Sequence, residues 1–96
     1  MADWSDLPGA EMVREGLADL RAGRETQSGL LVAIGAPRLR RLGIDVPMLE
    51  RPEHRLYDIL ARDESDSAHS RYNALIRRLV SFERALECAS ARVATG

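Results

Sequence analysis

Apolar residues in the last third of the chain recur at alternating steps of four and three residues. Within the run from residue 65 to 93 they lie at Ala68, Tyr72, Leu75, Leu79, Phe82, Leu86, Ala89 and Val93. This spacing produces a stripe along one face of an α-helix, whereas a half-buried strand alternates every second residue. The pattern therefore predicts one long amphipathic C-terminal helix, and we expect the rest of the chain to pack against it.

A short tail over residues 1–6 precedes the first of three shorter helices. The tail holds Trp4, which we expect to fold back as an anchor onto apolar surface, with a ligand-binding aromatic as the alternative. The first helix is expected to begin near Pro8, because proline is favoured at the first helical position, and to end at Gly23. Its inner face carries Val13, Leu17 and Leu20.

The second helix is short and strongly apolar from residue 30 to 34. Thr26 or Ser28 is suited to cap its first turn. Pro37 ends or bends it, because proline cannot donate a backbone hydrogen bond. The stretch 38–42 then makes at most a further short turn before Gly43.

Residues 44–49 are apolar but are interrupted by Pro47. We interpret them as an extended connection and not as a strand, because nothing obvious would pair with a strand here. Ile44 and Val46 are expected to fill part of the core. Pro52 then opens the third helix. The predicted fold is all-α: one domain over residues 1–96, a small helical bundle of three shorter helices packed on one long C-terminal helix.

The composition fits one small folded domain. Of 96 residues, 45% are hydrophobic and 30% are charged, and the formal net charge of -1 gives no general attraction to nucleic acid or anionic lipid. A single cysteine, Cys88, fits a reducing cytosol, and we expect it to be a buried, inert thiol. The first residues lack signal-peptide features, and no apolar run approaches the ~20 residues that cross a bilayer. We therefore expect a soluble, cytoplasmic protein.

The long helix is too long for a compact domain of this size. Roughly 28 residues at ~1.5 Å each span about 42 Å, whereas the expected radius of gyration of ~12.5 Å corresponds to a diameter of about 32 Å. One end should overhang and meet a second copy of the chain or another helical protein; the alternative is that it frays or folds back over its own bundle. In a parallel pair, Arg78 of one copy would lie near Glu83 of the other. The expected partner-binding residues are Leu79, Phe82, Leu86, Ala89 and Val93.

All fourteen basic residues are arginine, and guanidinium groups make the bidentate contacts that phosphates favour. A group of three follows the second helix and a Gly-Ala-Pro turn, which resembles a helix-turn-helix facing a phosphate backbone. Gly43 ends this element after about six residues, which is short for a helix that must lie in a major groove. Nucleic-acid binding is therefore the second hypothesis, and its candidate residues are Arg38, Arg40, Arg41, Arg77 and Arg78.

Arg62 and His69 are separated by six residues, a spacing that resembles the loose Arg-x4-6-His pattern of the HEPN ribonucleases. The resemblance implies a histidine that assists attack by a ribose 2′-hydroxyl and an arginine that steadies the phosphate. Against it, the acidic turn at residues 63–66 puts the two on different helices and would repel RNA. A small HEPN-like ribonuclease is the third hypothesis.

No motif predicts a metal or a cofactor. A di-metal helical bundle needs several inward carboxylates and paired Glu-x-x-His motifs, and neither is present in the sequence. There is also no nucleophile-elbow serine, no phosphate loop and no glycine-rich dinucleotide motif. The leading hypothesis is a noncatalytic cytoplasmic interaction or regulatory module that self-associates through its long C-terminal helix.

Overall fold

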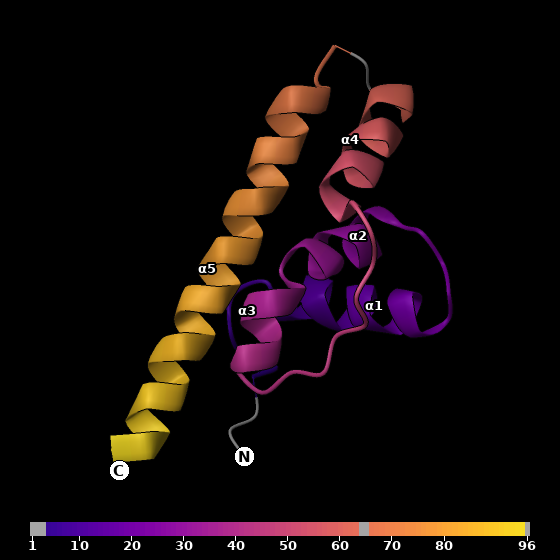
Figure 1. The fold of residues 1–96 in the computed structure, drawn as a ribbon. Coiled ribbons are helices and arrows are strands. Elements are labelled where there is room, and N and C mark those ends of the chain that lie inside the picture. Colours follow the sequence, from indigo (N-terminus) through magenta and orange to yellow (C-terminus); the bar gives the residue numbers. More distant parts are fainter. Residues whose placement is uncertain (1–3, 64–65, 96) are drawn as a thin grey trace.

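The computed structural model describes residues 4–63 and 66–95, and at positions 90 and 92–95 it describes the backbone only. The described chain contains helices and no strand (Figure 1), so the all-α prediction is confirmed. None of the described helices is both long and apolar enough to cross a membrane. The helices are α1 (Ala10–Arg21), α2 (Gln27–Ile34), α3 (Ala36–Arg41), α4 (Pro52–Asp63) and α5 (Ala68–Thr95).

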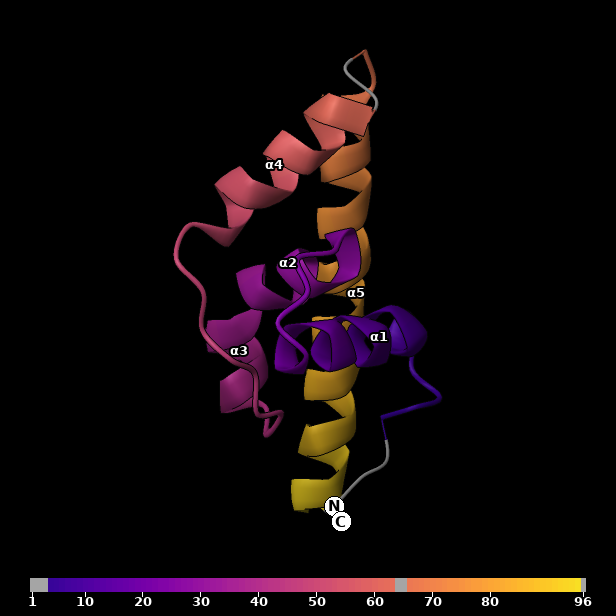
Figure 2. The ribbon, with the colours of Figure 1, turned by 90° about the vertical axis from the view of Figure 1, so that its right-hand side faces the viewer.

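Helix α5 forms an unbroken rod along one side of the molecule (Figures 1 and 2). α4 runs antiparallel beside its first half, where the rings of Tyr57 and Tyr72 lie 5.9 Å apart. α2 packs between α1 and α4 and also contacts α5. The molecule measures 47 × 25 × 19 Å, so it is elongated along the direction of the rod.

Two helix boundaries differ from the predicted ones. α1 begins at Ala10 and not at Pro8, because Gly9 has a φ of 82° and acts as the N-cap. This left-handed conformation is readily adopted only by glycine. Residues 36–41 form a helix of their own, α3, whereas only a short turn was expected after Pro37. Proline is tolerated there because it lies in the first turn of α3, where its missing N–H would have no helical partner.

The predicted cap and connection are confirmed. Thr26 caps α2 by accepting a hydrogen bond from the backbone N–H of Gly29 at 3.0 Å. After α3, Gly43 has a φ of 100°, which turns the chain back so that Ile44 donates its N–H to the carbonyl of Leu39 at 3.0 Å. The chain then runs extended to α4 and buries Ile44 and Val46.

The core lies between the four shorter helices and the inner face of α5. Phe82 is fully buried at its centre. Trp4 packs edge-on against Phe82, with 5.4 Å between ring centroids, so the expected anchoring of the N-terminal tail is confirmed. The buried apolar residues of α5 are Ala68, Leu75, Leu79, Phe82 and Leu86.

Candidate interaction surface

The predicted partner seam on α5 is largely covered by the chain itself. Leu79, Phe82 and Leu86 are 3%, 0% and 3% exposed. Ala89 is half-buried, and the side chain of Val93 lies outside the described residues. Three of the five expected partner-binding residues are therefore already part of the chain's own core. The core extends at least to Leu86 because α3 and the N-terminal segment reach that far along the rod.

A buried carboxylate joins α5 to α3. Glu83 is 5% exposed, and one of its oxygens lies 3.6 Å from the guanidinium of Arg38. Arg38 also donates a 2.7 Å hydrogen bond to Glu87, one helical turn further along α5. The predicted pair between Arg78 of one copy and Glu83 of another is therefore wrong for this fold, because Glu83 is already inside the chain's own core and paired there.

Burial raises the pKa of Glu83, because desolvation disfavours the charged carboxylate; the positive charges of Arg38 and Arg41 partly offset this effect. The group borders a hollow of about 270 Å³ between α3 and α5, which also exposes Ile76 and Val80. A sequence signal for this burial existed. Residue 83 lies four positions after Leu79 and three before Leu86, so it falls on the apolar face of the helix.

The arginines proposed for nucleic-acid binding do not form one patch. Arg38 and Arg41 border the hollow between α3 and α5, and Arg38 is neutralised by Glu83 and Glu87. Arg77 and Arg78 border a different hollow, which lies between α5 and the start of α1. Arg40 is exposed on α3. A helix-turn-helix contact through α3 is further disfavoured because α3 is only six residues long.

The outward side of α5 carries arginines without a carboxylate partner among the described residues. Its two acidic residues, Glu83 and Glu87, both face Arg38 of α3. By sequence, residues 68–95 hold five Arg and two Glu, a formal charge of +3, whereas residues 1–67 carry -4. The exposed arginines of this face are Arg71, Arg77, Arg78 and Arg84. Formal charge is therefore unevenly distributed along the chain: α5 is net basic, and the residues before it are net acidic.

From Ala85 onward, several of the described side chains of α5 are small. Ala85 and Ala89 are half-buried, and Cys88 and Ala91 are exposed. The expectation of a buried thiol is therefore wrong. Cys88 lies four residues after Arg84, seven after Ser81 and eleven after Arg77, so all four share one side of the helix. The other three residues are exposed, so this is the solvent side of α5.

The residues considered for catalysis or metal binding are not assembled into a site. His69 and Arg62 are both exposed, and Arg62 donates a hydrogen bond to the backbone carbonyl of Asp58 in its own helix, at 3.4 Å. Asp58 also pairs with His54 at 3.6 Å on the surface of α4. Within the described ranges, no three His, Cys, Asp or Glu side chains are grouped so that they could hold a metal ion.

Another buried carboxylate has a structural role that the sequence pattern did not reveal. Asp19 accepts hydrogen bonds from the Thr26 hydroxyl at 2.6 Å and from the Arg24 guanidinium at 3.0 Å. The hydrogen bonds from Thr26 and then Arg24 lower the pKa of Asp19 below its usual value. The cluster fixes the loop between α1 and α2 and orients the Thr26 cap.

Comparison with known proteins gives no relative from which a function can be transferred. No family model, no curated protein and no solved structure matches this chain.

Proposed function

We propose that this chain is a noncatalytic cytoplasmic interaction or regulatory module that self-associates through the C-terminal part of α5, with another helical protein as the alternative partner. The observation that carries the proposal is the length of α5. Its 28 residues correspond to about 42 Å, and its last turns run past the neighbouring helices (Figures 1 and 2). A helix end that extends past its neighbouring helices gains burial when it meets a second helix.

The burial of Leu79, Phe82 and Leu86 restricts the contact to the end of the helix. There Ala85 and Ala89 are four residues apart and half-buried, so they share one face of the helix. Position 93 continues this register in the sequence. Small side chains allow two helix axes to approach closely, at the short end of the usual ~8–10 Å. We propose this alanine face as the centre of the contact.

The test compares two alanines of α5. Ala89→Glu places a charge in the proposed contact, whereas Ala74→Glu, the matched control, places it on the exposed outer side of the first half. Sedimentation equilibrium should give twice the monomer mass for the wild type and for Ala74→Glu, and the monomer mass for Ala89→Glu. Circular dichroism should show equal helix content in all three. A monomeric wild type at ~100 µM, or equal masses for the two variants, would overturn the proposal.

Cys88 allows the pairing to be measured directly. It is the only cysteine in the chain and is exposed, so it accepts one spin label per copy. Double electron–electron resonance should give a distance of about 20 Å or less for a parallel pair, because paired helix axes lie ~8–10 Å apart. The absence of any dipolar coupling would contradict self-association through this end of α5.

The arginines on the outer face of α5 support a second candidate function, binding to nucleic acid. These are the exposed Arg71, Arg77, Arg78 and Arg84. Binding through phosphates would be strongly salt-dependent, and each lost contact would reduce the slope of log K against log salt by about 1. Fluorescence anisotropy with labelled RNA and duplex DNA tests this candidate. The double variant Arg77→Gln/Arg78→Gln should weaken nucleic-acid binding, and the control Arg62→Gln on α4 should not. Equal binding by the double variant and the control would exclude the outer face of α5 as the nucleic-acid site.

A further inference from the structure

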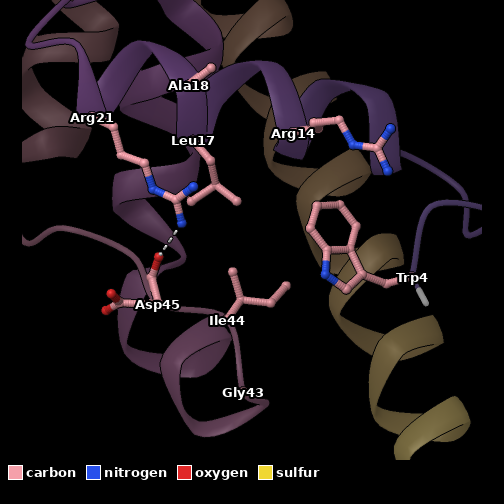
Figure 3. Close-up of a pocket in the computed structure, with 8 residues that line it drawn as sticks. All are labelled: Trp4, Arg14, Leu17, Ala18, Arg21, Gly43, Ile44 and Asp45. Atoms are coloured by element: carbon pink, nitrogen blue, oxygen red, sulfur yellow. Dashed lines mark hydrogen bonds between the residues drawn. The ribbon is translucent and has the colours of Figure 1, made fainter. Parts of the chain in front are cut away.

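A hollow of about 430 Å³ lies on the side of the molecule where three segments meet (Figure 3). Trp4 closes one end of it. α1 contributes Arg14, Leu17 and Arg21, and the connection after α3 contributes Ile44 and Asp45. Its size falls within the ~300–1,000 Å³ of small-molecule sites, which combine an apolar lining with a few placed polar groups.

The floor of the hollow is apolar. Leu17 and Ile44 belong to the core, with exposures of 5% and 7%, and Figure 3 shows them adjacent between Arg21 and Trp4. Ile44 reaches this place because the left-handed turn at Gly43 directs the chain back toward α1. The Trp4 indole is only partly buried and has its ring nitrogen on the side that faces Ile44 (Figure 3). A flat aromatic ligand in this hollow would therefore contact the apolar side chains of Leu17 and Ile44 and one N–H donor, the indole of Trp4.

The rim of the hollow is positively charged. Arg14 and Arg21 are seven residues apart on α1, so their side chains leave the same side of the helix two turns apart. Arg21 donates to the backbone carbonyl of Asp45 at 3.3 Å, and the carboxylate of Asp45 points away from the hollow (Figure 3). Arg14 lies over the Trp4 ring, 5.6 Å from its centroid. Neither guanidinium has a carboxylate partner in residues 4–63 or 66–95 of the described structure.

We propose that this hollow binds a small organic anion of the aromatic carboxylate class. The ring would lie on Leu17 and Ile44 beside Trp4, and the carboxylate would accept hydrogen bonds from Arg14 or Arg21. Arginine suits this role because its planar fork matches a carboxylate in bidentate geometry. The inference is independent of self-association, because α5 contributes none of the lining residues.

The probe is 2-naphthoate, followed by nuclear magnetic resonance at the indole N–H of Trp4, the only tryptophan in the chain. We expect a saturable shift of this signal. The neutral isostere 2-naphthamide should bind about tenfold more weakly, because it forms no charge-assisted hydrogen bond. Inorganic phosphate, which has no apolar body, should give no saturable shift. Non-saturable shifts, or equal affinities for the acid and the amide, would overturn the proposal without any variant being needed.

Variants then test the two arginines. Arg14→Gln is the cleaner change, because Arg21 also holds the connection through the carbonyl of Asp45. It should weaken 2-naphthoate binding about tenfold and leave 2-naphthamide binding unchanged. Arg40→Gln on the surface of α3 is the matched control and should bind like the wild type. If Arg40→Gln weakens binding as much as Arg14→Gln, the effect is general electrostatic attraction, and the assignment to this hollow is wrong.

Discussion

Replacing Gly16 with alanine should destabilise the fold, although alanine is the better helix former. Gly16 lies in the middle of α1, where the helix packs against α2. A methyl group at this position would lie 2.4 Å from the backbone oxygen of Ser28 and 2.5 Å from a methyl carbon of Val32. Ordinary contacts of a methyl carbon begin near 3.4 Å, so the conflict with the Ser28 carbonyl amounts to about 1 Å.

The size of the effect follows from two opposing contributions. The obstacle is backbone and cannot rotate away, so α1 must move away from α2. Overpacking of this kind costs typically ~1–3 kcal/mol, and a gap of ~1 Å between packed surfaces also loses a quarter to a half of their dispersion energy. Alanine in place of glycine stabilises a helix interior by ~0.8–1 kcal/mol. We therefore expect Gly16→Ala to lower the free energy of unfolding by about 2 kcal/mol.

A loss of this size is readily measured. Domains of this length have free energies of unfolding on the order of 5–14 kcal/mol, and ~2 kcal/mol corresponds to a decrease in Tm of roughly 8–16 °C. Urea and thermal unfolding followed by circular dichroism give both quantities. Gly29→Ala is the matched control, because its new methyl group would lie 3.2 Å from the Thr26 hydroxyl and 3.4 Å from the Arg24 carbonyl. The control should be as stable as the wild type or more so.

The comparison tests the close approach of α1 and α2 and not helix propensity. If Gly16→Ala is as stable as the wild type, the two helices do not meet at the distance that the structure shows. If both glycine variants lose the same stability, the cause is shared and is not the contact between Gly16 and Ser28.

Two further predictions concern α5. Leu75→Glu and Leu86→Glu should both unfold the domain or lower its free energy of unfolding by several kcal/mol, because each buries a charge without a partner. A Leu86→Glu variant that keeps its helix content in circular dichroism would contradict the burial of Leu86 in the chain's own core. Glu83→Gln should change the pH dependence of stability. The folded-state pKa of Glu83 is raised above 4.5, so the folded state binds more protons than the unfolded state in the pH window above that value. The contribution of Glu83 to stability therefore falls as pH rises through this window. Urea unfolding from pH 4 to 7 should show a smaller decrease with pH for Glu83→Gln than for the wild type, and parallel curves would contradict the burial of this carboxylate.

The local elements of the fold were predictable because short-range physics decides them. The alternation of four and three residues defined the inner face of α5, and the residues it marked in the first half, such as Leu75 and Tyr72, are buried or partly buried. Thr26 or Ser28 beside an apolar run predicted a capped start for α2, and Thr26 is the cap; Pro52 predicted the start of α4. The extended connection and the anchoring of Trp4 followed from proline placement and from the amphipathic nature of the indole.

Tertiary structure alone decided how much of α5 the chain itself covers. A periodic stripe identifies the side of a helix that avoids water, but it does not say whether a neighbouring helix or a second molecule covers that side. Leu79, Phe82 and Leu86 belong to the same stripe as Ala89, yet the first three are buried within the chain itself, where Gly35 approaches Leu79 and Trp4 packs against Phe82. The ion pair of Arg38 with Glu83 joins residues 45 positions apart, a pairing that no local pattern contains.

The candidate sites show the same division. Arg14 and Arg21 are ordinary surface residues when they are read along the chain, and only the turn at Gly43 brings Ile44 between Arg21 and Trp4. The sequence by itself determined most of the helices, the inner face of α5 and its length, because these depend on spacing and on the preferences of neighbouring residues. The tertiary structure decided which faces remain open and which charges meet, because these depend on contacts between segments distant in the chain.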